Sequence, residues 1–166
     1  MYYSRILDNT DEQALQQMLL QCNDYFELIF KRNCKETEAN ETFVSIPENK
    51  SYEDKFVIGI FNLENELKGV IDLIRDYPEK NTWFLGLMLF SPDFRNNGIG
   101  KRVFDDTEEY AVDLGAKIIR LAVVEQNKKG LNFWEKVGFK IIKEKTQELE
   151  GIATKIFILE KKVSDI

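Results

Sequence analysis

The sequence predicts a mixed α/β fold built around one largely antiparallel sheet. Apolar runs of strand length and amphipathic segments of helical period follow one another along all 166 residues. In the second half, a glycine-rich turn and a helical segment separate two apolar runs, an order that predicts one parallel crossover. Hydrophobic residues make up 43% of the chain, with twelve phenylalanines among them. This hydrophobic content is enough for one substantial core, and we expect a single domain spanning residues 1–166.

The N-terminal third is expected to hold one strand followed by helices. Residues 2–7 alternate as a strand does, and Thr10 with Gln13 three residues later forms a capping box that starts a helix. Residues 33–54 are polar, and they form either a lid over a substrate or a plain connection. The expected helices cover residues 10–23, 24–32 and 36–43.

Beyond Asp54, apolar runs of strand length dominate the sequence. Two of them are joined by a polar, turn-like insert at residues 62–66, which predicts an antiparallel hairpin. Gly138 ends the last helical stripe, and two further runs form a final antiparallel pair. The expected strands cover residues 56–61, 68–76, 83–90, 117–124, 139–145 and 153–160. The expected helices cover residues 101–114 and 127–137.

The turn at residues 91–100 is the segment most informative about function. It joins the uncharged run 83–90 to a helical segment, and it is rich in glycine and asparagine. Such a turn presents free backbone N–H groups beside the positive end of a helix dipole, a combination that favours an anionic phosphate. Glycine at positions 98 and 100 allows a ligand to approach the main chain without a Cβ in the way. The sequence therefore predicts an anion site here.

Composition narrows the classes of function. The net charge of −6 argues against a nucleic-acid binder driven by phosphate neutralisation, and fits either a cationic small substrate or plain solubility. Histidine is absent, which removes the commonest general base and metal ligand, and we expect no metal site. No apolar run approaches the roughly 20 residues of a membrane span, and the N-terminus lacks a signal peptide, so we expect a cytoplasmic protein. Cys22 and Cys34 are expected to be packed or free.

Two sequence motifs resemble a known family. Residues 127–139 open with an asparagine, continue as a helix and close on Gly-Phe, while residues 91–94 form a Ser-Pro lead-in to the glycine turn. The pattern Arg/Gln-x-x-Gly-x-Gly/Ala is matched by Arg95, Asn96, Asn97, Gly98, Ile99 and Gly100. With both motifs at the right separation, the sequence is similar to the GNAT-type N-acetyltransferases, which bind acetyl-coenzyme A. A dinucleotide-binding fold would need an early strand and a third glycine where Val103 stands.

The resemblance implies a GNAT-like mixed sheet of about seven strands with about four flanking helices. Family members hold the cofactor's pyrophosphate on backbone amides of the glycine motif, and the pantetheine arm lies along the strand before it. Gly86 within that strand fits a β-bulge that would open a slot for the thioester, or a mere packing accommodation. The implied cofactor-binding residues are Met88, Leu89, Phe90, Arg95, Asn96, Asn97, Gly98, Ile99, Gly100, Lys101, Asn127 and Trp134.

The implied chemistry lacks an obvious acid and base. Many family members carry a tyrosine in the second motif that protonates the departing thiolate, but Trp134 stands there, and an indole N–H is no acid at neutral pH. Water or another side chain then protonates the thiolate, or it leaves unprotonated. The candidate bases are Glu125, at the end of its strand, and Asp72 in mid-strand. On family analogy Tyr25 and Glu27 line the acceptor pocket, or Tyr25 packs its helix instead.

The function implied by the resemblance is direct transfer of an acetyl group from acetyl-coenzyme A to a primary amine of a small acceptor in a ternary complex. One alternative is a catalytically weak acyl-coenzyme A sensor, for which Trp134 is the chief support. Another is an acetyltransferase that acts on protein N-termini or lysines. We expect no nucleic-acid or membrane partner, and either a monomer or a homodimer.

Overall fold

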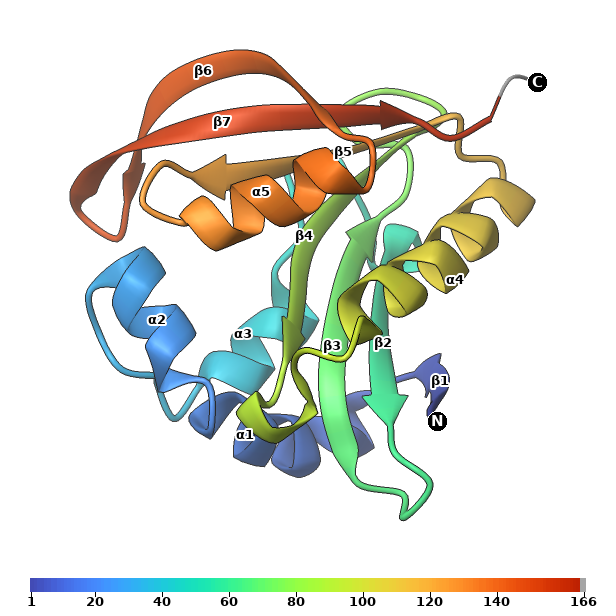
Figure 1. The fold of residues 1–166 in the computed structure, drawn as a ribbon, viewed down its shortest axis with the longest axis vertical. Helices are drawn as coiled ribbons and strands as arrows, with labels where there is room; N and C mark the ends of the chain where they lie inside the picture. The colour runs from blue at the N-terminus through green and yellow to red at the C-terminus, as the bar shows by residue number, and fades with distance from the viewer. Residues whose placement is uncertain (165–166) are drawn as a thin grey trace.

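The computed structural model describes residues 1–164, in which seven strands form one sheet with helices on both faces (Figure 1). The strands are β1 (Tyr3–Ile6), β2 (Lys55–Phe61), β3 (Leu67–Ile74), β4 (Thr82–Phe90), β5 (Ile118–Val124), β6 (Lys140–Leu149) and β7 (Ile152–Lys162). The helices are α1 (Glu12–Leu20), α2 (Asn23–Phe30), α3 (Glu38–Val44), α4 (Ile99–Asp113) and α5 (Lys128–Lys136). Short 3₁₀ turns cover Asn9–Asp11, Tyr52–Asp54 and Pro92–Phe94.

The sheet confirms the predicted α/β class. Its strands lie in the order β1-β2-β3-β4-β5-β7-β6, and every neighbouring pair is antiparallel except β4 and β5. That parallel pair is joined through α4, which is the predicted crossover. The described residues form five α-helices, which match the five predicted ranges and are one more than the roughly four that the resemblance implied. The final hairpin is also longer than predicted, because the polar, exposed residues of β6 beyond 145 give no apolar signal.

The first helix begins in a different way from the prediction. The Asp8 carboxylate accepts a hydrogen bond from the Thr10 N–H at 2.9 Å, and Asp11 accepts one from the Asp8 N–H at 3.0 Å. The predicted capping box of Thr10 and Gln13 was therefore wrong, because two aspartates three residues apart make the same reciprocal arrangement earlier in the chain. Arg5 holds Asp11 through two hydrogen bonds and so ties β1 to the start of the helical region.

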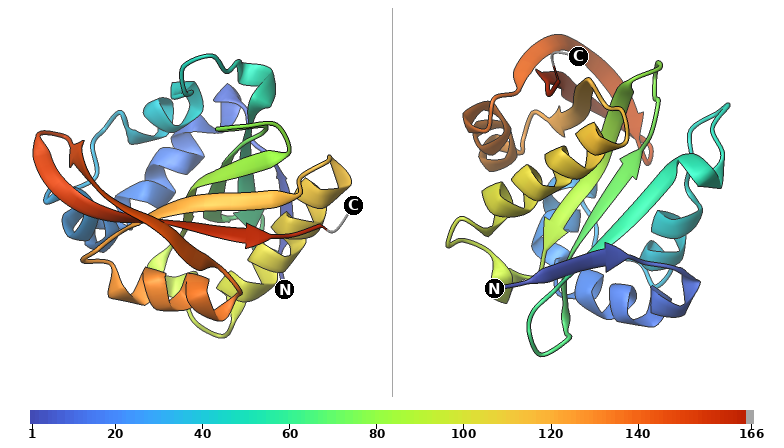
Figure 2. Two further views of the ribbon diagram at one scale, coloured as in Figure 1. Left: turned by 90° about the horizontal axis from the view of Figure 1, so that it is seen from above. Right: turned by 90° about the vertical axis from the view of Figure 1, so that its right-hand side faces the viewer.

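The two largest hydrophobic clusters lie on opposite faces of the sheet, and a third, small cluster contains Ile29, Val124 and Ile156. Figure 2 shows the helices on the two faces. Helices α4 and α5 cover one face, and α1, α2 and α3 cover the other. Strand β3 shows how the sequence divides between them: Ile71 and Leu73 belong to the core beneath α4 and α5, whereas Val70 belongs to the core beneath α1 to α3. Because successive side chains in a strand alternate, Asp72 lies on the same face as Val70.

Strands β4 and β5 separate part-way along their length. They pair only where Thr82–Phe84 faces Ile118–Arg120, although both strands continue beyond those residues. On the other side of β4, Leu85 pairs with Leu73 and Leu87 pairs with Asp72, so Gly86 is the extra residue of a β-bulge. This arrangement confirms the bulge interpretation of Gly86. The unpaired ends of β4 and β5 leave a slot between them.

Both cysteines are free thiols, as expected. Burial raises the pKa of the Cys22 thiol, and it raises the pKa of Cys34 to about 11. Neither thiol is therefore ionised to a useful extent near neutral pH. Within residues 1–164, no helix combines the length and the apolar character that crossing a membrane requires.

Candidate active site

The turn before α4 places a row of free N–H groups at a helix N-terminus. Asn96, Asn97 and Gly98 all adopt left-handed backbone, with φ of 71°, 58° and 72°. Asparagine and glycine are the residues that tolerate this conformation best. No acceptor among the described residues is paired with the N–H of these three residues, Gly100 or Lys101. Since α4 has no side-chain cap and no acidic residue in its first turn, this N–H row remains open to an anion.

Arg95 braces the turn from the side. Its Nε donates a hydrogen bond to the Phe90 carbonyl at 2.8 Å, and its two terminal nitrogens bind the Asp24 carboxylate at 2.5 and 3.1 Å. The Arg95 guanidinium thereby holds the pKa of the Asp24 carboxyl below its usual range. The brace links the turn to the end of β4 and to the first turn of α2. Arg95 therefore has a structural role in addition to any contact it makes with a ligand.

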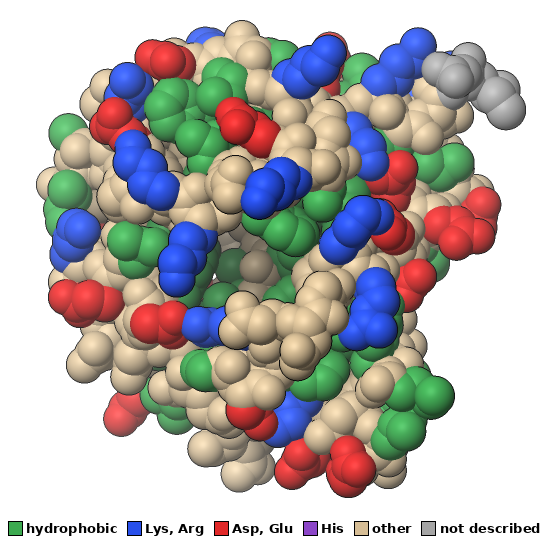
Figure 3. Space-filling view, in the orientation of Figure 1, with side chains coloured by type: hydrophobic (Ala, Val, Ile, Leu, Met, Phe, Trp, Pro, Cys, Tyr) green, Lys and Arg blue, Asp and Glu red, His purple; other side chains and the backbone are tan. Residues whose placement is uncertain are grey.

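A groove with a volume of about 480 Å³ runs from the N–H row to α5. The face that carries α4 and α5 is hollowed at its centre, and Lys and Arg side chains gather around the hollow (Figure 3). The chain as a whole is acidic, so this local excess of positive charge complements an anionic ligand. The groove is lined by Met88, Phe90, Arg95, Asn96, Gly98, Ile99, Gly100, Lys101, Phe133, Lys136 and Val137.

The two glycines of the motif have different roles. A Cβ at Gly98 would meet no atom within 4 Å, so the backbone there is open to the groove. A Cβ at Gly100 would lie 3.2 Å from Cε2 of Phe133, closer than such contacts comfortably allow. Gly100 therefore serves the packing of α4 against α5 as well as access to the groove, a role that the sequence did not reveal.

The slot between β4 and β5 opens beside this groove. A small cavity of about 70 Å³ lies between Gly86 to Met88 of β4 and Leu121 to Val123 of β5, and Tyr25, Asn127 and Trp134 complete its lining. The Asn127 side-chain oxygen accepts a hydrogen bond from the Gly130 N–H at 3.0 Å and so caps α5. The amide nitrogen of Asn127 is left without a partner among residues 1–164, and it can donate to a ligand.

A buried ion pair lies next to the bulge. The Lys55 ammonium binds both oxygens of Asp72, at 2.9 and 3.0 Å, and its side chain is only 3% exposed. A Cβ added at Gly86 would lie 3.6 Å from the Asp72 carboxylate, so the glycine leaves that carboxylate uncovered. Burial raises the pKa of Asp72, and the charge of Lys55 opposes that rise. Asp72 is thus a carboxylate of raised basicity, held in place beside the bulge at Gly86.

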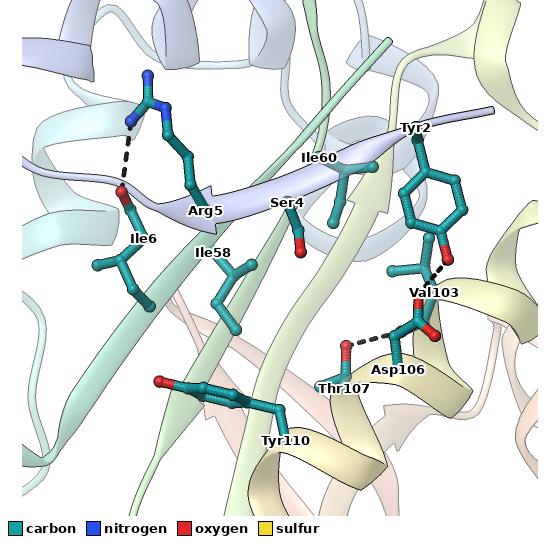
Figure 4. Close-up of a pocket in the computed structure, with 10 residues that line it drawn as sticks. All are labelled: Tyr2, Ser4, Arg5, Ile6, Ile58, Ile60, Val103, Asp106, Thr107 and Tyr110. Atoms are coloured by element: carbon teal, nitrogen blue, oxygen red, sulfur yellow. Dashed lines mark hydrogen bonds between the residues drawn. The ribbon is translucent and has the colours of Figure 1, made fainter. Parts of the chain in front are cut away.

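A second cavity, of about 330 Å³, lies between β1, β2 and α4 (Figure 4). Ile58, Ile60 and Val103 form its apolar floor, and the Tyr2 hydroxyl donates a hydrogen bond to Asp106 at its rim. None of its lining residues belongs to the N–H row or the slot. We therefore place the candidate site at the groove and the slot.

Comparison with known proteins decides the family. The model of the Acetyltransferase (GNAT) family matches residues 19–139, which contain the N–H row, both sides of the slot and the second motif. The chain belongs to this family. The fold and the family implied by the sequence motifs are thereby confirmed.

Individual relatives are similar over shorter stretches or at low identity. The thialysine N-epsilon-acetyltransferase of Bos taurus is 30% identical over 67 residues, which cover 37% of this chain and only 39% of that protein. The spermidine N-acetyltransferase of Vibrio cholerae, solved in complex with CoA and spermine, superposes with a TM-score of 0.74 at 16% sequence identity. The match covers 97% of this chain and 95% of that chain. The ribosomal-protein-S18-alanine N-acetyltransferase of Escherichia coli superposes with a TM-score of 0.73 at 12% sequence identity. That match covers 100% of this chain and 96% of that chain. At these identities the two structures show a shared fold alone.

In this GNAT chain, Trp134 is a core residue that also reaches the slot. Its side chain is 8% exposed and packs edge-on against Phe104, Phe133 and Phe139. It lines the small cavity between β4 and β5. Its indole forms no hydrogen bond among the described residues, so the slot receives an aromatic surface from Trp134 rather than an acid.

Tyr25 is the hydroxyl that faces the slot of this acetyltransferase fold. It lines the slot cavity, a channel of about 420 Å³ beside Asn127, and a cavity of about 160 Å³ beneath α2 and α3. Burial, with a smaller contribution from Glu38, raises the pKa of Tyr25 to about 12. The hydroxyl has no hydrogen-bond partner within residues 1–164. It is therefore a neutral donor available to a ligand at physiological pH.

The other expected site residues lie farther from the slot of the GNAT fold. The Glu125 side chain is 47% exposed and lies 3.7 Å from Lys155, and Glu27 is exposed on α2. Neither carboxylate lines the groove, the slot, the channel or the cavity beneath α2 and α3. Asp72 lines none of these spaces either, but of the two candidate bases it alone borders the bulge.

Proposed function

We propose that the chain transfers the acetyl group of acetyl-coenzyme A to a primary amine of a small acceptor, by direct attack in a ternary complex. The observation that carries the proposal is the row of unpartnered N–H groups at the start of α4, which opens into a groove beside the slot. Such a row suits the diphosphate of coenzyme A. The relatives named above act on amines, which supports an amine acceptor. We propose the same single domain, residues 1–166, as the unit of function.

Met88, Leu89 and Phe90 support the proposed path of the pantetheine arm. Met88 and Phe90 line the groove, Leu89 lines the channel beside Asn127, and Met88 also lines the slot. The arm would therefore run along the end of β4 from the N–H row to the slot. The thioester that coenzyme A carries supplies the acetyl group there.

Asp72 and Tyr25 are the groups that we assign to proton transfer. The amine nitrogen forms a bond to the acetyl carbonyl carbon, and the carbon–sulfur bond breaks. Asp72 accepts the proton that the amine loses, and Tyr25 donates a proton to the departing sulfur; both recover by exchange with solvent. The raised pKa of Asp72 makes it a stronger base than an ordinary aspartate, and Tyr25 holds its proton near neutral pH.

The region of the predicted lid favours a small acceptor over a protein. Glu38 and Thr42 of α3 line the cavity beneath α2 and α3, so the segment 33–54 contributes to its wall. That cavity has a volume of about 160 Å³ and borders Gly86 and Leu87 at the slot. A small amine fits inside a cavity of this size, which supports a small acceptor.

Calorimetric titration with coenzyme A, together with thiol release from acetyl-coenzyme A in the presence of primary amines, tests the proposal. We expect coenzyme A to bind and free thiol to accumulate only when a suitable amine is added. Binding without thiol release on any amine would support the sensor alternative instead. Absence of coenzyme A binding would contradict both functions.

Replacing Tyr25 with phenylalanine is expected to lower kcat by about 10- to 100-fold, at or below the lower end of general acid catalysis, because a thiol that titrates near 8.5 is already a fair leaving group. The affinity for coenzyme A should not change, since Tyr25 lies outside the N–H row. Steady-state kinetics and calorimetry measure the two effects. Tyr110→Phe, at an exposed tyrosine of α4 outside the slot, is the matched control. An unchanged kcat for Tyr25→Phe would remove this residue from the proton path.

A further inference from the structure

The cavity beneath α2 and α3 identifies a class of acceptor, an inference that rests on the proposed function. We propose that the acceptor is a monoamine whose amino group is attached to one compact apolar group, either a single aromatic ring or a short branched alkyl chain. The size of the cavity, the chemistry of its walls and the state of its charged groups all lead to this class.

The walls of the cavity are apolar and aromatic. Leu19, Phe26, Phe30 and Leu87 are half of its eight lining residues, and Tyr25 lines both this cavity and the slot. Leu19 is fully buried and Phe26 is 3% exposed, so these walls belong to the packed core of the α1 to α3 face. A cavity of roughly 150 Å³ with such walls holds a benzene molecule. The 160 Å³ here therefore suits one six-membered ring or its aliphatic equivalent.

The single carboxylate of the cavity lining is already neutralised. Glu38 accepts hydrogen bonds from the Arg32 guanidinium at 2.9 and 3.3 Å and from the Lys35 N–H at 3.0 Å. Arg32 also lies over the Phe30 ring, 4.9 Å from its centroid, so the cation is fixed against the cavity wall. A second ammonium group of the acceptor would therefore find Glu38 already paired with Arg32, rather than a free carboxylate.

The neighbouring acidic groups are engaged as well. Glu150 binds Arg32 at 2.7 Å and lies 3.7 Å from Lys35, which also approaches Glu41 at 3.4 Å. Asp72 is bound by Lys55 and serves the reacting amine. A polyamine would therefore bury an ammonium group without a partner, which costs several kcal/mol. A carboxylate on the acceptor would also lack a free partner, because Arg32 already binds two protein carboxylates, Glu38 and Glu150.

Comparison of amines as acceptors tests the inference. With saturating acetyl-coenzyme A, we expect kcat/KM for 2-phenylethylamine or isoamylamine to exceed that for spermidine or lysine at least about 10-fold, the effect of 1.4 kcal/mol. Thiol release gives the rate, and mass spectrometry of the product confirms the acetylated amine. Turnover that favours spermidine or lysine, or that does not distinguish the four amines, would overturn this inference and leave the proposed function intact. Coenzyme A binding without turnover of any amine would overturn both.

Removing the charge of Arg32 tests the same inference by changing the protein instead of the acceptor. Arg32→Met frees Glu38 and Glu150, so the ratio of kcat/KM for spermidine to that for 2-phenylethylamine should rise about 10-fold. Arg120→Met is the matched control, because Arg120 likewise binds two carboxylates, Glu160 and Glu79, but lies outside the cavity. An unchanged ratio in a folded Arg32→Met protein would contradict the assigned role of the neutralised carboxylate.

Discussion

Replacing Asp72 with asparagine is expected to lower kcat by about 10²- to 10⁴-fold, the range over which a positioned general base accelerates a reaction. Asparagine keeps the shape of the side chain, but it cannot accept the proton of the attacking amine. Coenzyme A should bind as before, because Asp72, on β3, lines neither the groove at the N–H row nor the slot. Stopped-flow measurement of thiol release and calorimetry with coenzyme A separate the two quantities.

The pH dependence of activity tests more directly whether Asp72 is the general base. Because burial raises the pKa of Asp72 above the ordinary value of 3.8, activity of the unmodified protein should fall as pH drops through that raised pKa. Asp72→Asn should lose this acid limb. Lys55→Met removes the charge that favours the ionised carboxylate, so its acid limb should move to higher pH. An acid limb that stays in place in both variants would show that another group is the base.

A loss of folding must be distinguished from a loss of the base. Asp72→Asn leaves the Lys55 ammonium buried without its counter-charge, and breaking such a pair costs about 3–5 kcal/mol. The double variant Lys55→Met/Asp72→Asn removes both charges, so we expect it to melt closer to the unmodified protein while remaining inactive. Recovery of kcat in the double variant would contradict the role of Asp72.

The open N–H row at the start of α4 could be predicted from sequence because it is built from neighbouring residues. The left-handed backbone at Asn96, Asn97 and Gly98 and the uncapped start of α4 are local consequences of a few residue types. The bulge at Gly86 is similar, since one glycine among bulky residues signals it. The predicted capping box of Thr10 and Gln13 was wrong because Asp8 and Asp11, slightly earlier in the chain, form the capping box instead.

The surroundings of the proposed proton-transfer groups depend on contacts between segments that are far apart in the sequence. Such contacts cannot be read from a single sequence. Lys55 meets Asp72 only because β2 and β3 pair in one register out of several that their apolar pattern allows. Arg95 meets Asp24 across 71 positions of sequence. Asp72 lies on β3 and Glu125 lies in the turn directly after β5, so the sequence could not tell which of them borders the bulge.

Replacing Gly98 with valine is expected to raise the dissociation constant for coenzyme A about 100-fold. The new side chain would occupy the open space above the N–H row and keep the diphosphate from two of its donors. Hydrogen bonds to charged groups contribute about 1.5–3 kcal/mol each, so losing two costs roughly 3 kcal/mol or more. Isothermal titration with coenzyme A measures the change, and it does not require the acceptor to be known.

Backbone strain alone could also weaken the Gly98→Val protein, because φ at this position is +72° and a valine there costs about 1–2 kcal/mol. Gly151, in the turn between β6 and β7, is a matched control: its φ is +84°, and a Cβ there would also meet no atom within 4 Å. Gly151→Val should therefore lower the melting temperature by a similar amount and leave the coenzyme A affinity unchanged. If both variants bound coenzyme A as well as the unmodified protein does, the diphosphate would lie elsewhere, and the site at the start of α4 would lose its proposed ligand.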